Sequence, residues 1–416
     1  MSGKTFQPNF LWGSATAAHQ VEGNNRNSDC WALEHAQPSL FAEPSGDAVD
    51  QWNRFEEDLD LLKSIGLNAY RFSVEWARVE PEPGQFSNEV LDHYRAVIAA
   101  CHKRSIAPVV TLHHFTQPLW MAQLGGFASA QFAGRFADYC GQAANALDGI
   151  ALACTINELN LPLSAQSYFW ELADVARRQV AERALGAPLS SFFLFAGEHA
   201  LTNGLAAHAS ARQAIRAERS GLPVGMTLAI SEETAVPGAE ALRDERRERF
   251  YAPFLDAARN DEFVGIQTYS RVMSRRDGTA GPADGAPLTT MPWEDRPEAL
   301  GEVCQWVASR WPMPMIVTEN GYPGEDDSRR AAFIETALSG LMSAMKNGAD
   351  VRGYFYWSLL DNFEWMFGYR QRFGLVAVDR VSQQRQVKRS AGTLRSRIPA
   401  SEEELRAFGI ANSMII

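Results

Sequence analysis

The fold of this chain is decided by two apolar runs, Ala151-Leu152-Ala153-Cys154-Thr155-Ile156 and Met315-Ile316-Val317-Thr318. The first leads into Asn157-Glu158 and the second into Glu319-Asn320-Gly321. Neither run alternates apolar and polar residues, which is typical of strands buried on both faces of a parallel sheet. Each glutamate alone would most often be a helix N-terminal acid or a loop residue. Only their convergence in one architecture would indicate a site.

Similar runs recur along the whole sequence and predict eight strands, at residues 10–15, 69–73, 107–112, 151–156, 224–229, 264–268, 315–318 and 351–356. Amphipathic stretches separate them. Trp52, Phe55, Leu59 and Leu62, for example, recur at helical spacing and predict a helix that ends at Ile65-Gly66. Eight strands, each followed by a helical segment, predict a (β/α)8 (TIM) barrel as a single domain over residues 1–416. A doubly wound dinucleotide-binding sheet is disfavoured because no Gly-x-Gly-x-x-Gly turn follows the first strand.

Composition excludes several classes of protein. The chain has 46% hydrophobic and 21% charged residues, and no run of about 18 apolar residues predicts a membrane span. Its first residues, Met1 to Pro8, lack an apolar signal core, and its five cysteines are widely spaced without a Cys-x-x-Cys pair. We therefore expect a cytoplasmic protein with no disulfide framework, no metal and no cofactor.

Charge argues against nucleic acid as a partner, because the net charge is −11 and the dense cluster at residues 243–249 alternates in sign, as a solvated helix face does. The oligomeric state is left open, a homo-oligomer included.

Polar and aromatic residues gather at the predicted carboxyl ends of the strands, and in a barrel these ends share one face. They are Gln20, Arg71, His114, Asn157, Glu158, Tyr269, Glu319 and Trp357. Singly, each has a structural alternative, such as a core histidine for His114 or an ion-pair partner for Arg71. Jointly they predict an active site in which a glutamate pair supplies acid/base and nucleophilic chemistry for a glycosidic bond. The Gly- and Pro-rich segment 270–295 is expected on the same face, as a passive insertion or as a substrate-contacting lid.

The sequence resembles glycoside hydrolase family 1. The resemblance rests on Phe10-Leu11-Trp12-Gly13-Ser14-Ala15-Thr16-Ala17-Ala18-His19-Gln20-Val21-Glu22-Gly23, on residues 70–76, on the two glutamate motifs, on residues 356–365 and on residues 373–379. These blocks occur in the order of that family and extend over about residues 6 to 395.

The resemblance implies a cofactor-free retaining exo-β-glycosidase that acts on a small β-glycoside, most like a β-glucosidase with some tolerance for β-galactosides or β-fucosides. In it, Glu158 is the general acid/base and Glu319 the nucleophile, with Arg71 and Tyr269 supporting the nucleophile. The expected substrate-binding residues are Gln20, His114, Asn157, Tyr269, Trp357, Glu364 and Trp365. Trp357 would form the platform beneath the ring, and the charge of Glu364 would repel a 6-phosphate.

Three places depart from the pattern of the family. Leu159 stands where proline usually follows the acid/base, Gln267-Thr268 stands where Asn-Tyr is usual, and residues 113–116 also differ. The effect of Leu159 and of Gln267-Thr268 is left open, a change in how Glu158 is held included. A sugar-binding barrel without turnover and a transglycosylase are the alternatives to hydrolysis.

Overall fold

The computed structural model describes residues 10–398, so Met1 to Pro8 and the ends of the expected 1–416 domain lie outside the described residues. Its centre is a parallel sheet in the order β5-β4-β3-β2-β1-β12-β11-β8-β6. The strands are β1 (Leu11–Ala15), β2 (Ala69–Ser73), β3 (Ala107–His113), β4 (Leu152–Ile156), β5 (Val224–Gly225), β6 (Thr227–Ala229), β8 (Val264–Gln267), β11 (Met315–Asn320) and β12 (Val351–Trp357). The predicted TIM barrel is confirmed.

The fifth predicted strand is interrupted in the structure. Instead of one strand over 224–229, β5 and β6 are separated by Met226. β5 pairs with β4, whereas β6 pairs with β8, so this broken strand links the two ends of the sheet and closes the barrel. The seventh strand is longer than predicted, because β11 runs through Glu319 and ends at Asn320.

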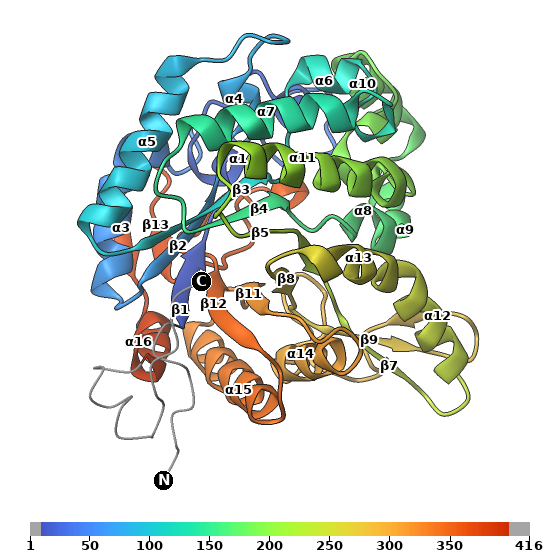
Figure 1. Ribbon diagram of the computed structural model, residues 1–416. Helices are drawn as coiled ribbons and strands as arrows, with labels where there is room; N and C mark the ends of the chain where they lie inside the picture. Colours follow the sequence, from blue (N-terminus) through green and yellow to red (C-terminus); the bar gives the residue numbers. More distant parts are fainter. Residues whose placement is uncertain (1–9, 399–416) are drawn as a thin grey trace.

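Helices surround the strands, as Figure 1 shows. The outer layer contains α3 (Gln51–Ser64), α5 (Asn88–Lys103), α7 (Phe132–Ala146), α11 (Leu205–Glu218), α13 (Ala252–Ala257), α14 (Ala299–Arg310), α15 (Asp327–Lys346) and α16 (Arg389–Arg397). The expected end of α3 is confirmed: Gly66 follows with φ +90°, a conformation that glycine adopts without steric cost. No helix within residues 10–398 combines the length and hydropathy needed to cross a bilayer.

The barrel interior is tightly packed. Every residue of β2, β4, β8 and β11 is buried. At Gly265 in β8, a Cβ atom would lie 2.5 Å from Cγ2 of Thr227 and 2.8 Å from Oγ1 of Thr318. A larger residue would clash with both threonines, so glycine at this position lets β6 and β11 pack closely against β8.

Along the chain, further elements come between most barrel strands and the outer helices that follow them. They are α1 (Ala18–Val21), α2 (Asp29–Glu34), α4 (Trp76–Val79), α6 (Leu119–Gln123), α8 (Leu161–Ser164), α9 (Gln166–Leu172), α10 (Val175–Leu185) and α12 (Glu240–Phe250), with the strands β7 (Glu232–Ala235), β9 (Arg271–Ser274), β10 (Ala280–Gly281), β13 (Val376–Val378) and β14 (Arg385–Val387). β7, β9 and β10 form a small separate sheet. The segment 270–295 is therefore partly strand, where the sequence predicted a loop.

Candidate active site

Glu319 is held from three directions at the carboxyl end of β11. Nη1 of Arg71 lies 2.6 Å from its Oε1, and Nε2 of Gln267 donates to the same oxygen at 2.8 Å. The Tyr269 hydroxyl donates to Oε2 at 2.6 Å. Arg71 comes from β2 and Gln267 from β8, so three barrel strands converge on one carboxylate. Its orientation is therefore fixed before any substrate binds.

Glu158 follows β4 with a backbone φ of +47°, a left-handed conformation that is rare for a residue with a side chain. Its N–H donates to the Thr227 hydroxyl at 3.0 Å, and that hydroxyl donates to Oδ1 of Asn157 at 3.1 Å. Arg71 and Gln267 also donate to Oδ1 of Asn157. One hydrogen-bond network thus links the Glu158 backbone to the donors of Glu319.

The two glutamates differ in their tendency to hold a proton. Burial raises the pKa of the Glu158 carboxyl well above its usual value, and the negative charge of Glu319 raises it further. Burial also raises the pKa of Glu319, but the Arg71 guanidinium and then the Tyr269 hydrogen bond lower it in part. The sequence predicted the effect of Arg71 but not the larger opposing effect of burial. The surroundings therefore favour a proton on Glu158 more than on Glu319.

Aromatic rings and amides form the deeper part of the site. The His114 ring stacks against Trp357 at 5.6 Å and against Trp365 at 6.0 Å between centroids, and Asn157 donates to its Nε2 at 3.1 Å. Burial lowers the pKa of His114 well below its usual value, so the ring is neutral. Adjacent His113 faces away, packed against the rings of Phe127, Phe132, Phe136 and Phe193.

Glu364 is buried, and its surroundings act against the negative charge expected for it. Nε2 of Gln20 lies 3.3 Å from Oε2 of Glu364 and donates at 2.7 Å to the carbonyl of Phe363. Burial, with a smaller contribution from the charge of Glu319, raises the pKa of Glu364 to about 8. The carboxyl is then mostly neutral at pH 7 in the sugar-free site, so charge repulsion alone does not exclude a 6-phosphate.

Most of these residues line one cavity of about 530 Å³. Eight of the ten predicted site residues line it, namely His114, Asn157, Glu158, Tyr269, Glu319, Trp357, Glu364 and Trp365. Gln20 and Arg71 are fully buried and act on this lining through the contacts described above. Segment 270–295 contributes Arg271, Val272 and Trp293 among others, which favours the substrate-contacting alternative.

Thr227 and Thr111 were not predicted from the sequence, although both position site residues. Thr227 holds Glu158 and Asn157, and Oγ1 of Thr111 accepts a hydrogen bond from Nε of Arg71 at 3.0 Å. Their position in predicted strands was the available signal, since threonine in an otherwise apolar buried strand needs a hydrogen-bond partner. Gln267 was flagged as unusual, but it contacts Glu319 and Asn157 instead of Glu158 directly.

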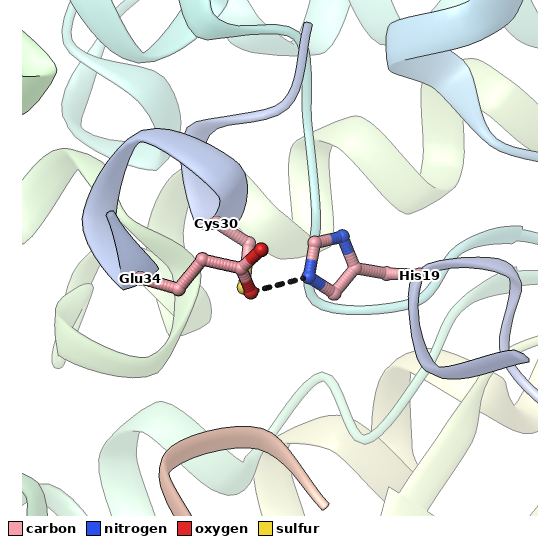
Figure 2. A group of neighbouring side chains, drawn as sticks. All are labelled: His19, Cys30 and Glu34. Carbon is pink, nitrogen blue, oxygen red and sulfur yellow. Dashed lines mark hydrogen bonds and ion pairs between the residues drawn. The ribbon is translucent and has the colours of Figure 1, made fainter. Parts of the chain in front are cut away.

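The structure also brings together a group that the sequence did not predict. His19 on α1 and Cys30 and Glu34 on α2 are buried, and their potential metal-ligating atoms lie within 4.8 Å of one another (Figure 2). His19 Nε2 donates to Glu34 at 3.2 Å, Ser45 donates to the other Glu34 oxygen at 2.6 Å, and Asn25 donates to His19 at 3.1 Å.

His19 and Glu34 are satisfied by hydrogen bonds within the protein. Burial raises the pKa of the Cys30 thiol well above its usual value, so it is a poor metal ligand in this setting. The His19 ring stacks parallel to Trp365 at 5.8 Å, with 7° between the planes. The group is therefore best described as a buried structural support for Trp365. Its residues do not line the cavity.

Comparison with known proteins agrees with this geometry. The sequence profile of glycosyl hydrolase family 1 matches residues 2–276 and 257–402. A bifunctional β-D-glucosidase/β-D-fucosidase of Bifidobacterium breve is 32% identical over 459 residues, which cover 92% of this chain and 96% of that protein.

Solved structures of β-glycosidases have the same fold. The β-glycosidase BGL167 is 45% identical with a TM-score of 0.90, covering 95% of this chain and 98% of that one. A β-glycosidase from Pyrococcus horikoshii is 30% identical with a TM-score of 0.82, covering 99% of each chain. The fold and the carboxylate pair define a barrel glycoside hydrolase. The chain belongs to glycosyl hydrolase family 1.

Proposed function

We propose that this enzyme is a retaining exo-β-glucosidase that also accepts β-fucosides or β-galactosides, with Glu319 as nucleophile and Glu158 as general acid/base. The observation that carries the proposal is the asymmetry of the glutamate pair. Glu319 receives three hydrogen bonds from fixed donors, whereas burial and the neighbouring charge favour a protonated Glu158. The name of the Bifidobacterium breve relative supports glucose and fucose as the sugars.

In the first step, the Glu319 carboxylate attacks the anomeric carbon while Glu158 gives its proton to the glycosidic oxygen, and the alcohol leaves. The sugar is then bound covalently to Glu319. In the second step, Glu158 takes a proton from water, which attacks the same carbon and releases Glu319. One water is consumed, and two inversions retain the β configuration. This mechanism predicts carboxyl groups about 5–5.5 Å apart.

The sugar ring would lie on Trp357, with its hydroxyl groups bonded by Gln20, His114, Asn157, Glu364 and Trp365. In neutral His114, Nε2 accepts from Asn157, so its free Nδ1 can donate to a hydroxyl group, and a protonatable Glu364 can donate or accept. Tyr269 would contact the substrate as well as Glu319. We also propose a cytoplasmic location, supported by five buried cysteines, all with free thiols.

The enzyme should select against 6-phosphorylated sugars because the arginines that line the cavity are already paired, and not because of the charge of Glu364. Arg246 and Arg271, which line the cavity, are tied in two-point ion pairs to Glu233 and Glu294. A phosphate would therefore be buried without a free cation, which costs several kcal/mol. We expect kcat/KM on a nitrophenyl β-glucoside to exceed that on its 6-phosphate at least about 100-fold. Comparable values would contradict this proposal.

Proton NMR of the first product tests the proposed function. Hydrolysis of a nitrophenyl β-glucoside should release β-glucose first, and α-glucose should appear only by mutarotation. α-Glucose as the initial product would show inversion, and binding without turnover would show a sugar-binding barrel. Added methanol tests for transglycosylation: methyl glucoside as the main product at low methanol concentration would favour a transferase.

A further inference from the structure

The cavity that Glu158 lines has an apolar wall. Its residues are Leu161, Ala165, Tyr168, Phe169, Leu172 and Leu194. Five of the six come from the segment that carries α8 and α9, which begins three residues after Glu158. Glu158 is the proposed proton donor to the leaving oxygen and lines the same cavity as these residues, so we place the leaving group against this wall.

Other segments add more apolar surface to the lining of the cavity. Val272 and Trp293 come from segment 270–295, and Phe367 ends the short helix after Glu364. Trp293 packs against Tyr269 at 5.4 Å between ring centroids. The lining of the cavity thus has aliphatic and aromatic side chains from three separate segments of the chain.

The charged groups of this region are already paired within the protein. Arg246 makes two hydrogen bonds of 2.9 Å to Glu233, and Arg271 makes two to Glu294. The Ser270 hydroxyl donates to the Glu294 carbonyl at 2.8 Å. A second sugar would bring several hydroxyl groups that need partners, and a buried hydroxyl without one is destabilising. An alkyl or aryl group needs only apolar contact.

We propose that the natural substrates are β-glucosides of apolar alcohols or phenols, whose alkyl or aryl group lies against the apolar wall, and not β-linked disaccharides. This inference rests on the proposed function and specifies its leaving group. Tyr168, with 41% of its surface exposed, would cover the outer end of the alkyl or aryl group.

A series of alkyl β-D-glucosides tests the inference. Methyl, butyl and hexyl glucosides are compared with cellobiose, because unbranched alcohols differ little in leaving-group acidity and their chain length reports on apolar contact. We expect kcat/KM to rise about two- to four-fold per methylene, and the hexyl glucoside to exceed cellobiose at least about ten-fold. A flat series, or cellobiose as the better substrate, would overturn the inference and leave the β-glucosidase function intact. No turnover of any of the four, or of a nitrophenyl β-glucoside, would overturn both.

Leu172→Asn tests whether the apolar wall causes this dependence on chain length. It should lower the ratio of kcat/KM for hexyl to methyl glucoside about three- to ten-fold, because a polar side chain replaces part of the apolar wall. The matched control is Leu124→Asn, since Leu124 is 42% exposed and lies outside the cavity. Tyr168→Ser, at a more exposed position, should lower the same ratio and replaces Leu172→Asn if that variant does not fold. An unchanged ratio in the folded variant would contradict the inference.

Discussion

At the scale of single residues, the active site depends on side chains that each serve two partners. Arg71 and Gln267 both donate to Glu319 and to Asn157. Glu158 has a positive φ, as do Phe115 and Trp365, which also line the cavity. Such conformations cost about 1–3 kcal/mol each and persist when surrounding contacts fix them. Here these contacts include the Thr227 hydrogen bond to the Glu158 backbone.

Gln267→Leu should raise the pKa of Glu319, because a hydrogen bond to a carboxylate favours its ionised form. The nucleophile must be ionised in the free enzyme. The acid limb of the pH profile of kcat/KM should therefore move upward by about one pH unit, and its maximum should fall about ten-fold. Gln131→Leu, at an exposed position, is the control. An unmoved acid limb would mean that Gln267 does not act on Glu319.

At the scale of elements, the eight barrel strands were predictable because strands buried on both faces are continuous apolar runs. The break at Met226 was not, since residues 224–229 are no less apolar than the other runs. β7, β9 and β10 were also missed: they are short, and they carry charged residues such as Glu232 and Arg271. Contacts such as that of Gln267 with Glu319 depend on how neighbouring strands are staggered, which the sequence alone does not reveal.

The group of His19, Cys30 and Glu34 was missed because it joins two short helices across a turn of irregular chain. Exhaustive chelation should leave β-glucoside hydrolysis unchanged, since the proposed steps are completed by two carboxylates and since His19 and Glu34 are satisfied by hydrogen bonds. Activity is measured before and after treatment, with metal analysis of the protein. Loss of activity that zinc restores in the native enzyme, but not in Cys30→Ala, would show that the group is a metal site.

At the scale of the whole molecule, stability should depend on carboxyls buried with raised pKa values. Burial raises the pKa of Asp29 to about 7, above the 3.8 expected when the chain is unfolded. Between pH 3.8 and about 7, Asp29 is mostly protonated in the folded state and mostly ionised in the unfolded state. The contribution of Asp29 to the free energy of unfolding is therefore complete below about pH 4 and is lost as pH rises to about 7.

Asp29→Asn should make the free energy of unfolding less sensitive to pH. Its change between pH 4 and 7 should be smaller in the variant than in the native protein by roughly 2–4 kcal/mol. An asparagine can still accept the hydrogen bonds from the N–H groups of Cys30 and Gln117. Urea unfolding at several pH values measures the difference, with Asp92→Asn as the control because the Asp92 side chain is 70% exposed. An equal pH dependence in the native protein and in Asp29→Asn would contradict this account.

The assignment of the two glutamates is tested most directly by azide rescue. In Glu319→Gly, azide should attack an activated β-glucoside from the vacated face and give the α-glycosyl azide by one inversion. In Glu158→Ala, the covalent intermediate still forms when the leaving group is good, but its breakdown lacks a base. Azide should then intercept it and give the β-azide by two inversions. The opposite pairing of products would mean that nucleophile and acid/base have been exchanged, and an active double variant would place the chemistry elsewhere.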